Sequence, residues 1–378
     1  MVSLSNFYLI RPPFESKQEQ TFDWLVEAHT LSEKSKGLSE ESLALFREKL
    51  RERLWHVGAK SDQISKRGHI LADFLHLDWD KMEIYKLKES PSGANLSVRL
   101  KYFDAFVDHV FDTYYPEISS PPDDLIHVSC TGYLSPSGAQ KLVSKRGWGS
   151  TTTVTHAYHM GCYGAFPAIR MGTGFLKTGK ERVDIVHTEI CSLHSNPSLH
   201  ESDQLVSQSL FADGFIKYSL AQNFSGCQLK VLAVHEEIIP DSIDSMTWNV
   251  VDWGNQISLA KETPALIARA LRGYLKTLCE KAGLPDSVLE RALYAIHPGG
   301  PKILQQIQQR LNLSEAQMSY SFQIMKKYGN MSSATLPHIW EAILADTSVE
   351  DRSLMISLAF GPGLSISGSI MVKETCGS

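Results

Sequence analysis

Three residues in this sequence, a cysteine, a histidine and an asparagine, stand in surroundings that suit acyl-transfer chemistry. Cys162 lies between two glycines in "YHMGCYGAF", residues 158 to 166. Glycines permit a sharp turn and leave room for a substrate carbonyl beside the sulfur. If the cysteine opens a helix, the positive end of the helix dipole favours its reactive thiolate, and Pro167 suits an early helical position. Taken alone, the cysteine is more readily interpreted as a buried, inert thiol.

His297 and Asn330 are candidates for proton transfer and hydrogen bonding to the same substrate. His297 ends an apolar run and precedes a Pro-Gly-Gly-Pro turn in "AIHPGGPKIL". Its imidazole would therefore stand at the end of a strand, and the small residues that follow would leave it accessible to a ligand. Asn330 lies between a glycine and small residues in "YGNMSSATLPHIW". Each also has a structural interpretation, as a hydrogen-bonded strand-end histidine and as the N-cap of the next helix.

The elements that would position these residues alternate between strands and helices. Apolar, β-branched runs predict strands within 123–132, 182–190, 214–220, 229–239 and 293–300. Helical periodicity predicts helices at 39–55, 263–283 and 314–329. Thr263 suits the N-cap and Gly283 the end of the second helix, while Ser314 and Gln317 form a capping-box pattern in the third. The alternation favours an α/β fold.

The chain also suggests two similar halves. Each closes in two strands around a glycine turn, in "SLFADGFIKYSL" and in "SLAFGPGLSISGSIMV". We therefore expect one half over residues 1–225, carrying the cysteine, and a second over 226–378, carrying the histidine and asparagine.

Composition excludes several classes of protein. The chain has 378 residues, of which 43% are hydrophobic and 21% charged, and its net charge of -5 argues against a broad nucleic-acid-binding face. No apolar run approaches the ~18 residues of a membrane span, and the N-terminus does not resemble a signal peptide. The six cysteines form no C-x-x-C pair, which makes zinc and thioredoxin-like sites weak interpretations. We expect a cytoplasmic protein with reduced thiols, without a metal, resident cofactor or nucleic-acid partner.

Together the motifs resemble the signature of the type III polyketide synthases, the chalcone synthase-like branch of the thiolase superfamily. The resemblance rests on "GCYGAF", "HPGGPKIL", "GNMSSAT" and "FGPGLS" (360–365), in that family's order and spacing. It extends from about residue 60 to the C-terminus. "SLFADG", with Phe211, matches a further motif in which the phenylalanine gates the cavity.

The resemblance implies a five-layered αβαβα thiolase fold, a homodimer and a Cys-His-Asn triad reached through a pantetheine tunnel. Cys162 would take an acyl group from an acyl-CoA or an acyl carrier protein, with His297 holding the thiolate as an ion pair. His297 and Asn330 would then stabilise the enolate formed from malonyl-CoA as it loses carbon dioxide. The extended chain is expected to cyclise to a pyrone, resorcinol or related ring.

The resemblance also assigns residues around the triad. Ile257 stands where the family's second gating phenylalanine is expected. Trp248 replaces a small residue and should shorten one branch of the cavity, so the expected product is not a plant chalcone. The other expected cavity residues are Phe211, Thr131, Ser135, His194, Ser207, Ser332, Gly361 and Pro362. The expected CoA-phosphate residues are Lys60, Lys66, Arg67 and Lys302, each of which could equally be a solvated surface charge.

Three alternatives stay open. A ketosynthase III-like enzyme uses the same three residues for a single condensation or for joining two acyl chains. A papain-like hydrolase also runs Cys, His, Asn in order, but this chain does not have a tryptophan after the cysteine. A non-catalytic thiolase-fold partner subunit typically loses the nucleophile, which is present here.

Overall fold

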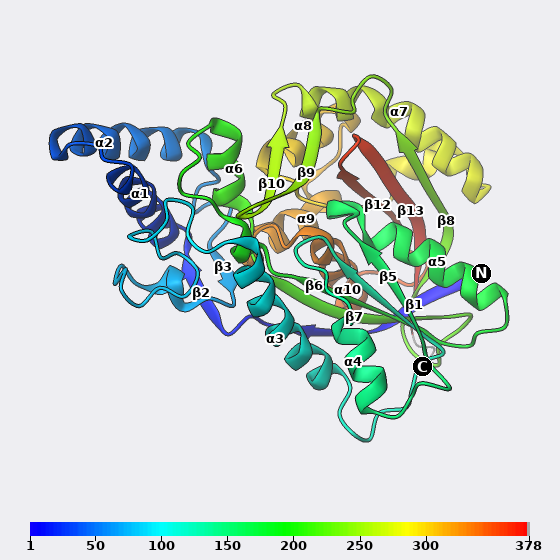
Figure 1. The fold of residues 1–378 in the computed structure, drawn as a ribbon. Helices are drawn as coiled ribbons and strands as arrows, with labels where there is room; N and C mark the ends of the chain where they lie inside the picture. The colour runs from blue at the N-terminus through cyan, green and yellow to red at the C-terminus, as the bar shows by residue number, and fades with distance from the viewer. Residues whose placement is uncertain (376–378) are drawn as a thin grey trace.

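The computed structural model describes residues 1–375 of the chain and centres on a nine-stranded sheet in the order β11-β12-β13-β8-β1-β7-β6-β4-β5 (Figure 1). The strands are β1 (Val2–Ile10), β2 (Phe14–Lys17), β3 (Lys66–His69), β4 (Asp124–Ser129), β5 (Thr153–Tyr158), β6 (Val183–Glu189), β7 (Gly214–Ala221), β8 (Gln228–Ile238), β9 (Met246–Val251), β10 (Gly254–Leu259), β11 (Leu293–Ile296), β12 (Leu354–Gly361) and β13 (Ser365–Glu374). The α-helices are α1 (Gln18–Ser35), α2 (Glu40–Val57), α3 (Leu96–Tyr114), α4 (Gly138–Lys145), α5 (Ala165–Lys177), α6 (Ser202–Leu210), α7 (Thr263–Ala282), α8 (Pro301–Leu311), α9 (Glu315–Tyr328) and α10 (Thr335–Ala345).

The strand order repeats across the middle of the sheet. β4 and β6 are parallel, β7 is antiparallel to β6, and β1 is antiparallel to β7. In the same order, β11 and β12 are parallel, β13 is antiparallel to β12, and β8 is antiparallel to β13. β1 and β8 then pair with each other and join the two sets into one sheet. The division expected after residue 225 falls in the connection between β7 and β8.

Three hydrophobic clusters show how the layers stack. The middle cluster holds α5 and α10 against strands of both halves, and Phe166 meets Trp340 there with ring centroids 5.9 Å apart. A second cluster lies under α1, α3 and α4 on the first half, and a third under α7, α8 and α9 on the second. The two sets of strands in the sheet thus lie on either side of α5 and α10, and each set is covered on its other face by further helices. The layers run helix, sheet, helix, sheet, helix, which is the thiolase-like α/β arrangement expected from the sequence.

The helix boundaries follow the local signals closely. Ser314 Oγ accepts a hydrogen bond from the Gln317 backbone N–H, and the Gln317 side chain accepts one from the Ser314 backbone, so the predicted capping box is present. Gly283 ends α7 with a φ of 67°, in the left-handed region that glycine tolerates. The prediction for the start of α7 is one residue out, because Glu262 is the N-cap and Thr263 the first helical residue.

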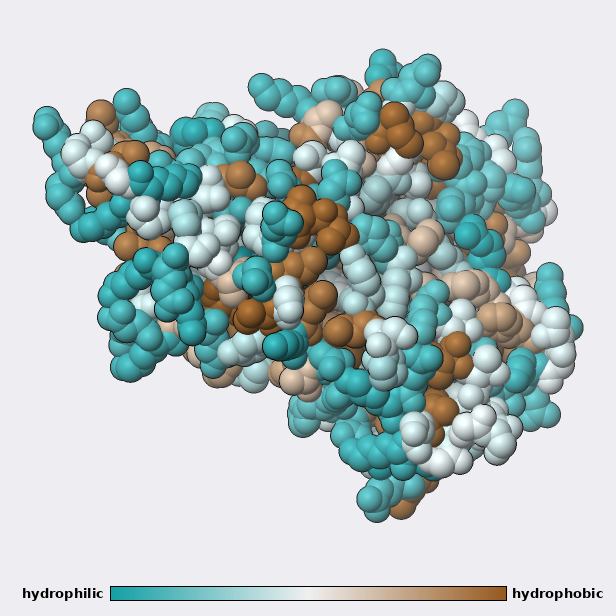
Figure 2. Space-filling view, in the orientation of Figure 1, coloured by the Kyte–Doolittle hydropathy of each residue, from teal (hydrophilic) through white to brown (hydrophobic). Residues whose placement is uncertain are grey.

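Among residues 1–375, no helix has both the length and the apolarity that a membrane crossing requires. Figure 2 shows hydrophobic residues gathering near the middle of one face, over the β9–β10 hairpin, with hydrophilic residues around them. That hairpin also contributes residues to the cavities described next.

Candidate active site

Cys162 lies in a single 3-10 turn, Gly161–Tyr163, immediately before α5. Gly161 has a φ of 76°, and a Cβ added there would stand 2.6 Å from Cδ of Pro362. Gly361 is equally constrained, because a Cβ there would stand 2.2 Å from the Tyr163 ring. The "FGPG" segment therefore packs directly behind the cysteine turn. This contact explains why the two motifs need glycine at these positions.

Cys162 lines a narrow cavity whose unfilled space, counted together with the open solvent at its mouth, is about 350 Å³. Ser332 Oγ lies 3.8 Å from the sulfur, within reach of a weak hydrogen bond. Six of the cavity residues expected from the sequence line this space, namely Thr131, Phe211, Trp248, Ile257, Ser332 and Pro362. The structure therefore brings these six residues together around the cysteine, and their role toward a substrate stays a prediction.

Asn330 is held by the segment that carries Phe211. The Asn330 backbone N–H donates to Leu210 O at 2.9 Å, and the Ala212 N–H donates to Asn330 O at 2.8 Å. The side-chain oxygen of Asn330 accepts a hydrogen bond from the Ser332 N–H at 2.9 Å. Because that oxygen is occupied, the amide nitrogen is the end of the side chain left to donate to a substrate.

His297 follows β11 and is only 1% exposed. Its backbone N–H donates to Leu358 O of β12 at 2.8 Å, which fixes the residue at the strand end. Neither ring nitrogen has a hydrogen-bond partner among the described residues. A buried imidazole with both nitrogens unpaired is unusual in a structural role and is typical of a group that meets a ligand. Burial lowers the pKa of His297 to about 3, so its ring is neutral near pH 7.

Burial acts on Cys162 in the opposite sense and raises the pKa of its thiol to about 12. The hydrogen bond from Ser332 offsets a small part of this, while the charge of Glu189 adds to it. Within residues 1–375, no hydrogen bond joins Cys162 to His297 or Asn330. The structure therefore favours an uncharged thiol and an uncharged imidazole, and it does not show the resting ion pair expected from the sequence.

A buried carboxylate, Glu189, lies beneath the cysteine and was not anticipated. It accepts hydrogen bonds from the Cys130 N–H, from Thr131 Oγ1 at 2.8 Å and from Ser333 Oγ. Cys130 Sγ also lies 2.8 Å from Ser332 Oγ, which connects this network to the cavity. Burial raises the pKa of Glu189.

The sequence did contain a signal for part of this arrangement. Cys130, Cys162 and Cys191 each follow the carboxyl end of one of three neighbouring strands, β4, β5 and β6, and all three line the cavity. The carboxyl ends of adjacent parallel strands meet at one edge of a sheet, where ligands commonly bind. Among the described residues no group of His, Cys, Asp or Glu is placed to hold a metal ion.

A second cavity shares part of its wall with the first, and its unfilled space, counted together with the open solvent at its mouth, is about 600 Å³. The shared residues are Cys191, Phe211, Trp248 and Ile257. Trp248 and Ile257 are paired across the β9–β10 hairpin, and the rings of Trp248 and Phe211 have centroids 6.4 Å apart. His194 and Ser207, both expected to shape the product, line this second cavity. The two departures from the plant pattern therefore stand between the two spaces.

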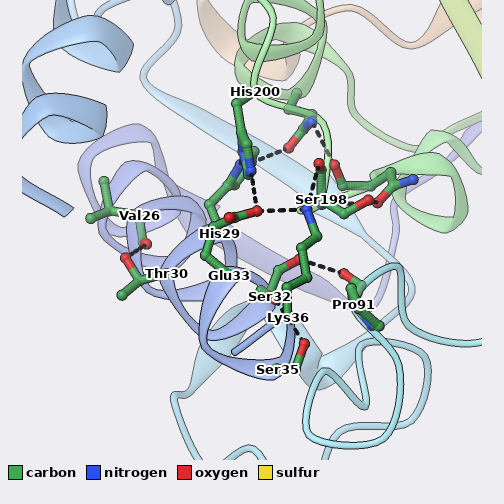
Figure 3. Close-up of polar contacts among 12 residues, drawn as sticks. Val26, His29, Thr30, Ser32, Glu33, Ser35, Lys36, Pro91, Ser198 and His200 are labelled. Atoms are coloured by element: carbon green, nitrogen blue, oxygen red, sulfur yellow. Dashed lines mark hydrogen bonds and ion pairs between the residues drawn. The ribbon is translucent and has the colours of Figure 1, made fainter. Parts of the chain in front are cut away.

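The helix that leads to Phe211 is anchored to α1 by a polar cluster (Figure 3). His29 Nδ1 and His200 Nδ1 are 2.8 Å apart, and His200 Nε2 lies 2.8 Å from a Glu33 oxygen. The other ring nitrogen of His29 reaches Gln208 of α6, also at 2.8 Å. Burial lowers the pKa of His29 to about 3. These contacts hold the segment just before α6 and its last turn, which leads directly to Phe211.

One sequence assignment, Arg67, differs from the structure, and another, Ser135 at the expected dimer crossing, is not tested by a single chain. Ser135 is exposed in the loop after β4 and lines neither cavity, so this chain alone does not place it at the site. Arg67 is 5% exposed and lines the second cavity, so it is not one of the surface charges expected to bind CoA phosphates. The expectation grouped it with its neighbours in sequence, but its side chain turns inward and donates to Gln208 O and Phe211 O at the end of α6.

The remaining three lysines do lie at the surface. Lys60 and Lys302 are exposed, and Lys66 pairs with Glu15. A shallow groove runs between the segments that carry Lys60 and Lys302, and its lining includes Lys326. These side chains can attract a phosphate without any cost of burial.

Residues 230–374 match the family model described as chalcone and stilbene synthases, C-terminal domain. The chain is related to the type III polyketide synthases. It is 27% identical over 258 residues to "Type III polyketide synthase B" of Arabidopsis thaliana, covering 65% of this chain and 66% of that protein. It is 28% identical over 254 residues to "1,3,6,8-tetrahydroxynaphthalene synthase" of Streptomyces coelicolor, covering 67% of each. It is also 29% identical over 259 residues to "Probable polyketide synthase 1" of Dictyostelium discoideum, where 65% of this chain spans only 8% of the relative.

Solved type III polyketide synthase structures share the fold over nearly the whole chain. The C-terminal type III domain of Steely1 from Dictyostelium superposes with a TM-score of 0.81 at 22% identity, covering 98% of this chain and 99% of that one. The Streptomyces coelicolor tetrahydroxynaphthalene synthase gives 0.80 at 22% identity, covering 99% of both chains. The thiolase-like fold expected from the sequence is thereby confirmed.

Proposed function

We propose that the chain is a polyketide-forming acyltransferase that loads an acyl group from an acyl-CoA onto Cys162 and extends it with malonyl-CoA. The observation that carries the proposal is His297, a buried imidazole whose two ring nitrogens have no hydrogen-bond partner among the described residues. The proposal brings this imidazole together with the glycine-flanked thiol of Cys162 and the amide of Asn330. The triad assignment follows the family resemblance, and the geometry of each residue separately suits its role.

The loading step begins with the proton of the Cys162 thiol. His297 is neutral and has a free ring nitrogen, so it accepts this proton as the sulfur attacks the thioester carbon of the acyl-CoA. The carbon–sulfur bond to CoA breaks, and the CoA thiolate leaves with the proton. Because burial disfavours either charge alone, the thiolate and the imidazolium form together and stabilise each other.

Condensation then uses the same donors on a second thioester. Malonyl-CoA loses its carboxylate as carbon dioxide, and the electron pair of the broken bond passes to the thioester oxygen. A His297 N–H and the Asn330 amide N–H stabilise that enolate oxygen. The enolate carbon attacks the acyl carbonyl, the Cys162 thiolate leaves, and the product is a β-ketoacyl-CoA two carbons longer.

We extend the proposal to the oligomeric state, the cellular location, the substrates and the products of the enzyme. The enzyme acts as a homodimer in the cytoplasm on CoA thioesters, without a resident cofactor, and cyclises the extended chain to a pyrone, resorcinol or related ring. Lys60 and Lys302 flank the groove that would receive the CoA phosphates. An acyl carrier protein would approach the same face as an alternative acyl donor.

The test is incubation with a panel of acyl-CoAs, with and without malonyl-CoA. Mass spectrometry of the intact protein should show one acyl adduct, lost in Cys162→Ala and retained in the matched variant Cys279→Ala, whose thiol is buried in α7. Product masses should rise by two or more two-carbon units. A single unit would instead assign a ketosynthase III-like reaction, and an unmodified wild-type protein would overturn the proposal.

A further inference from the structure

Arg67 of β3 is a buried arginine that uses only one of its three nitrogens. Its Nη1 donates to Gln208 O at 2.7 Å and to Phe211 O at 2.8 Å, at the end of α6. Its Nε and Nη2 atoms are buried and have no hydrogen-bond partner among the described residues. Unpaired donors on a buried charge are costly, so the arrangement requires a reason beyond capping α6.

Arg99 shows what a purely structural arginine looks like in this molecule. It is 0% exposed, and every nitrogen of its guanidinium donates to a backbone carbonyl. Nε reaches Ala94 O at 2.7 Å, Nη2 reaches Ser92 O at 2.6 Å, and Nη1 reaches Leu193 O and Ser195 O. Compared with Arg99, Arg67 has two guanidinium nitrogens without a hydrogen-bond partner among the described residues, and a structural role does not explain them.

No protein carboxylate pairs with the Arg67 charge in the described part of the chain. The acidic group that acts on it is Asp213, whose oxygens accept from the Ile70 N–H at 2.7 Å and from Ser192 N–H and Oγ at 2.8 and 2.7 Å. Burial lowers the pKa of Arg67 to about 9, so the group stays charged at neutral pH. An anionic partner from outside the chain would complete this site.

The free nitrogens belong to a side chain that lines the second cavity. This space shares Phe211, Trp248, Ile257 and Cys191 with the Cys162 cavity, and these residues form the wall between the two. A chain attached to Cys162 reaches the second cavity only when this wall opens. Nε and Nη2 form one edge of the planar guanidinium, and this edge matches two oxygens that share a negative charge.

We infer that Arg67 is a specificity-determining residue that binds the far end of the acyl chain carried by Cys162 through a pair of oxygens sharing one negative charge. Two chain ends have this chemistry, a terminal carboxylate on the starter and the enolised 1,3-dicarbonyl of a chain already extended. The inference rests on the proposed function, because it assumes an acyl chain on Cys162.

Direct binding to the whole protein tests the recognition without catalysis. Hexanoate and acetylacetone, which present the two oxygen pairs, should each raise the melting temperature in a concentration-dependent way, since a ligand of the native state stabilises it. Hexanamide, which is neutral, should not. Arg67→Lys keeps the charge and removes the flat edge, and Arg67→Met removes both, so the shift should vanish in each variant. The wild-type comparison of hexanoate with hexanamide decides the matter even where a variant does not fold.

Turnover distinguishes the two chain ends. If the starter carboxylate is the ligand, Arg67→Lys should lower kcat/KM for glutaryl-CoA about tenfold to hundredfold, the size of a lost charge-assisted hydrogen bond, and spare pentanoyl-CoA. If the 1,3-dicarbonyl is the ligand, pentanoyl-CoA should load normally but yield products with one extension in place of two or more. Arg99→Lys is the matched control, which should lower stability without changing either ratio.

A failure of the proposed function can be distinguished from a failure of the inference about Arg67. If no acyl-CoA modifies Cys162, the proposed function fails, and the binding experiment still decides the role of Arg67. If neither hexanoate nor acetylacetone binds the wild type, or if both Arg67 variants keep wild-type substrate and product ratios within twofold, the recognition role is overturned and the guanidinium serves only to cap α6.

Discussion

Replacing Gly161 with alanine should destabilise the protein and displace its nucleophile. Gly161 has a φ of 76°, and an added Cβ would stand 2.6 Å from Cδ of Pro362. The unfavourable φ and the steric clash with Pro362 both arise at the residue that directly precedes Cys162. Pro362 lies in the turn between β12 and β13, and its ring is bonded to the backbone. Its Cδ therefore cannot move aside as the end of a flexible side chain would.

The expected cost has two parts. A left-handed φ costs an alanine about 1–2 kcal/mol, and forcing a methyl group into a packed site costs about 1–3 kcal/mol. The sum is about 2–5 kcal/mol. With an unfolding entropy of about 2.1 cal/mol/K per residue, the 378 residues give about 0.8 kcal/mol/K, so the melting temperature should fall by about 3–6 °C.

Two other glycines separate these contributions. Gly283 also has a positive φ, 67°, but nothing lies within 4 Å of an added Cβ, so its alanine variant measures the backbone cost alone. Gly174 lies within α5 with open space around it and no positive φ, so alanine there should stabilise by about 0.5–1 kcal/mol. Thermal unfolding of the three variants, with acyl loading of Cys162 as a second readout, is the assay. If Gly161→Ala is no less stable than Gly283→Ala, the argument from the Pro362 contact is refuted.

Three further outcomes are expected. Trp248→Gly should join the two cavities and lengthen the products by at least one two-carbon unit in mass spectrometry; an unchanged product spectrum would contradict the cavity assignment. Lys302→Glu should raise KM for CoA thioesters several-fold with kcat unchanged, and more so at low salt, whereas a salt-independent KM would remove this lysine from phosphate binding. Burial lowers the pKa of His127 and His187 from 6.5 to about 3. Their neutral forms therefore contribute stability above pH 6.5 that is lost as the pH falls toward 3. In urea titrations the free energy of unfolding should fall between pH 7.5 and 5.5 by about 1 kcal/mol for each such histidine, and equal free energies at the two pH values would exclude this linkage.

The sequence predicted the parts of the site that depend on local backbone geometry. Glycines around Cys162, the turn after His297 and the small residues after Asn330 all reflect close packing at fixed chain positions, and such constraints leave a visible residue type. The capping box was predictable for the same reason, since Ser314 and Gln317 exchange hydrogen bonds within one helical turn. The family resemblance added the fold, which no single motif could supply.

The sequence could not show what depends on distant segments meeting. In the sequence, Arg67 looks like one more charge in a basic stretch. Only the contacts of its side chain with the end of α6 show that it is buried. The elevated pKa of Cys162 likewise comes from burial by several elements and could not be read from its glycine neighbours. The role expected for Ser135 stays a prediction, since its position in the motif is one that crosses a dimer interface and a single chain does not test it.

The backbone bridge between Phe211 and Asn330 has a consequence for redesign. Each residue is hydrogen-bonded through the other's segment, so the proposed gate, Phe211, and the proposed enolate donor, Asn330, are expected to move together. Altering the gate to admit a larger starter will also shift the amide that supports decarboxylation. Libraries aimed at new substrates should therefore vary the β9–β10 hairpin, which faces the same opening and shares no backbone hydrogen bond with Asn330.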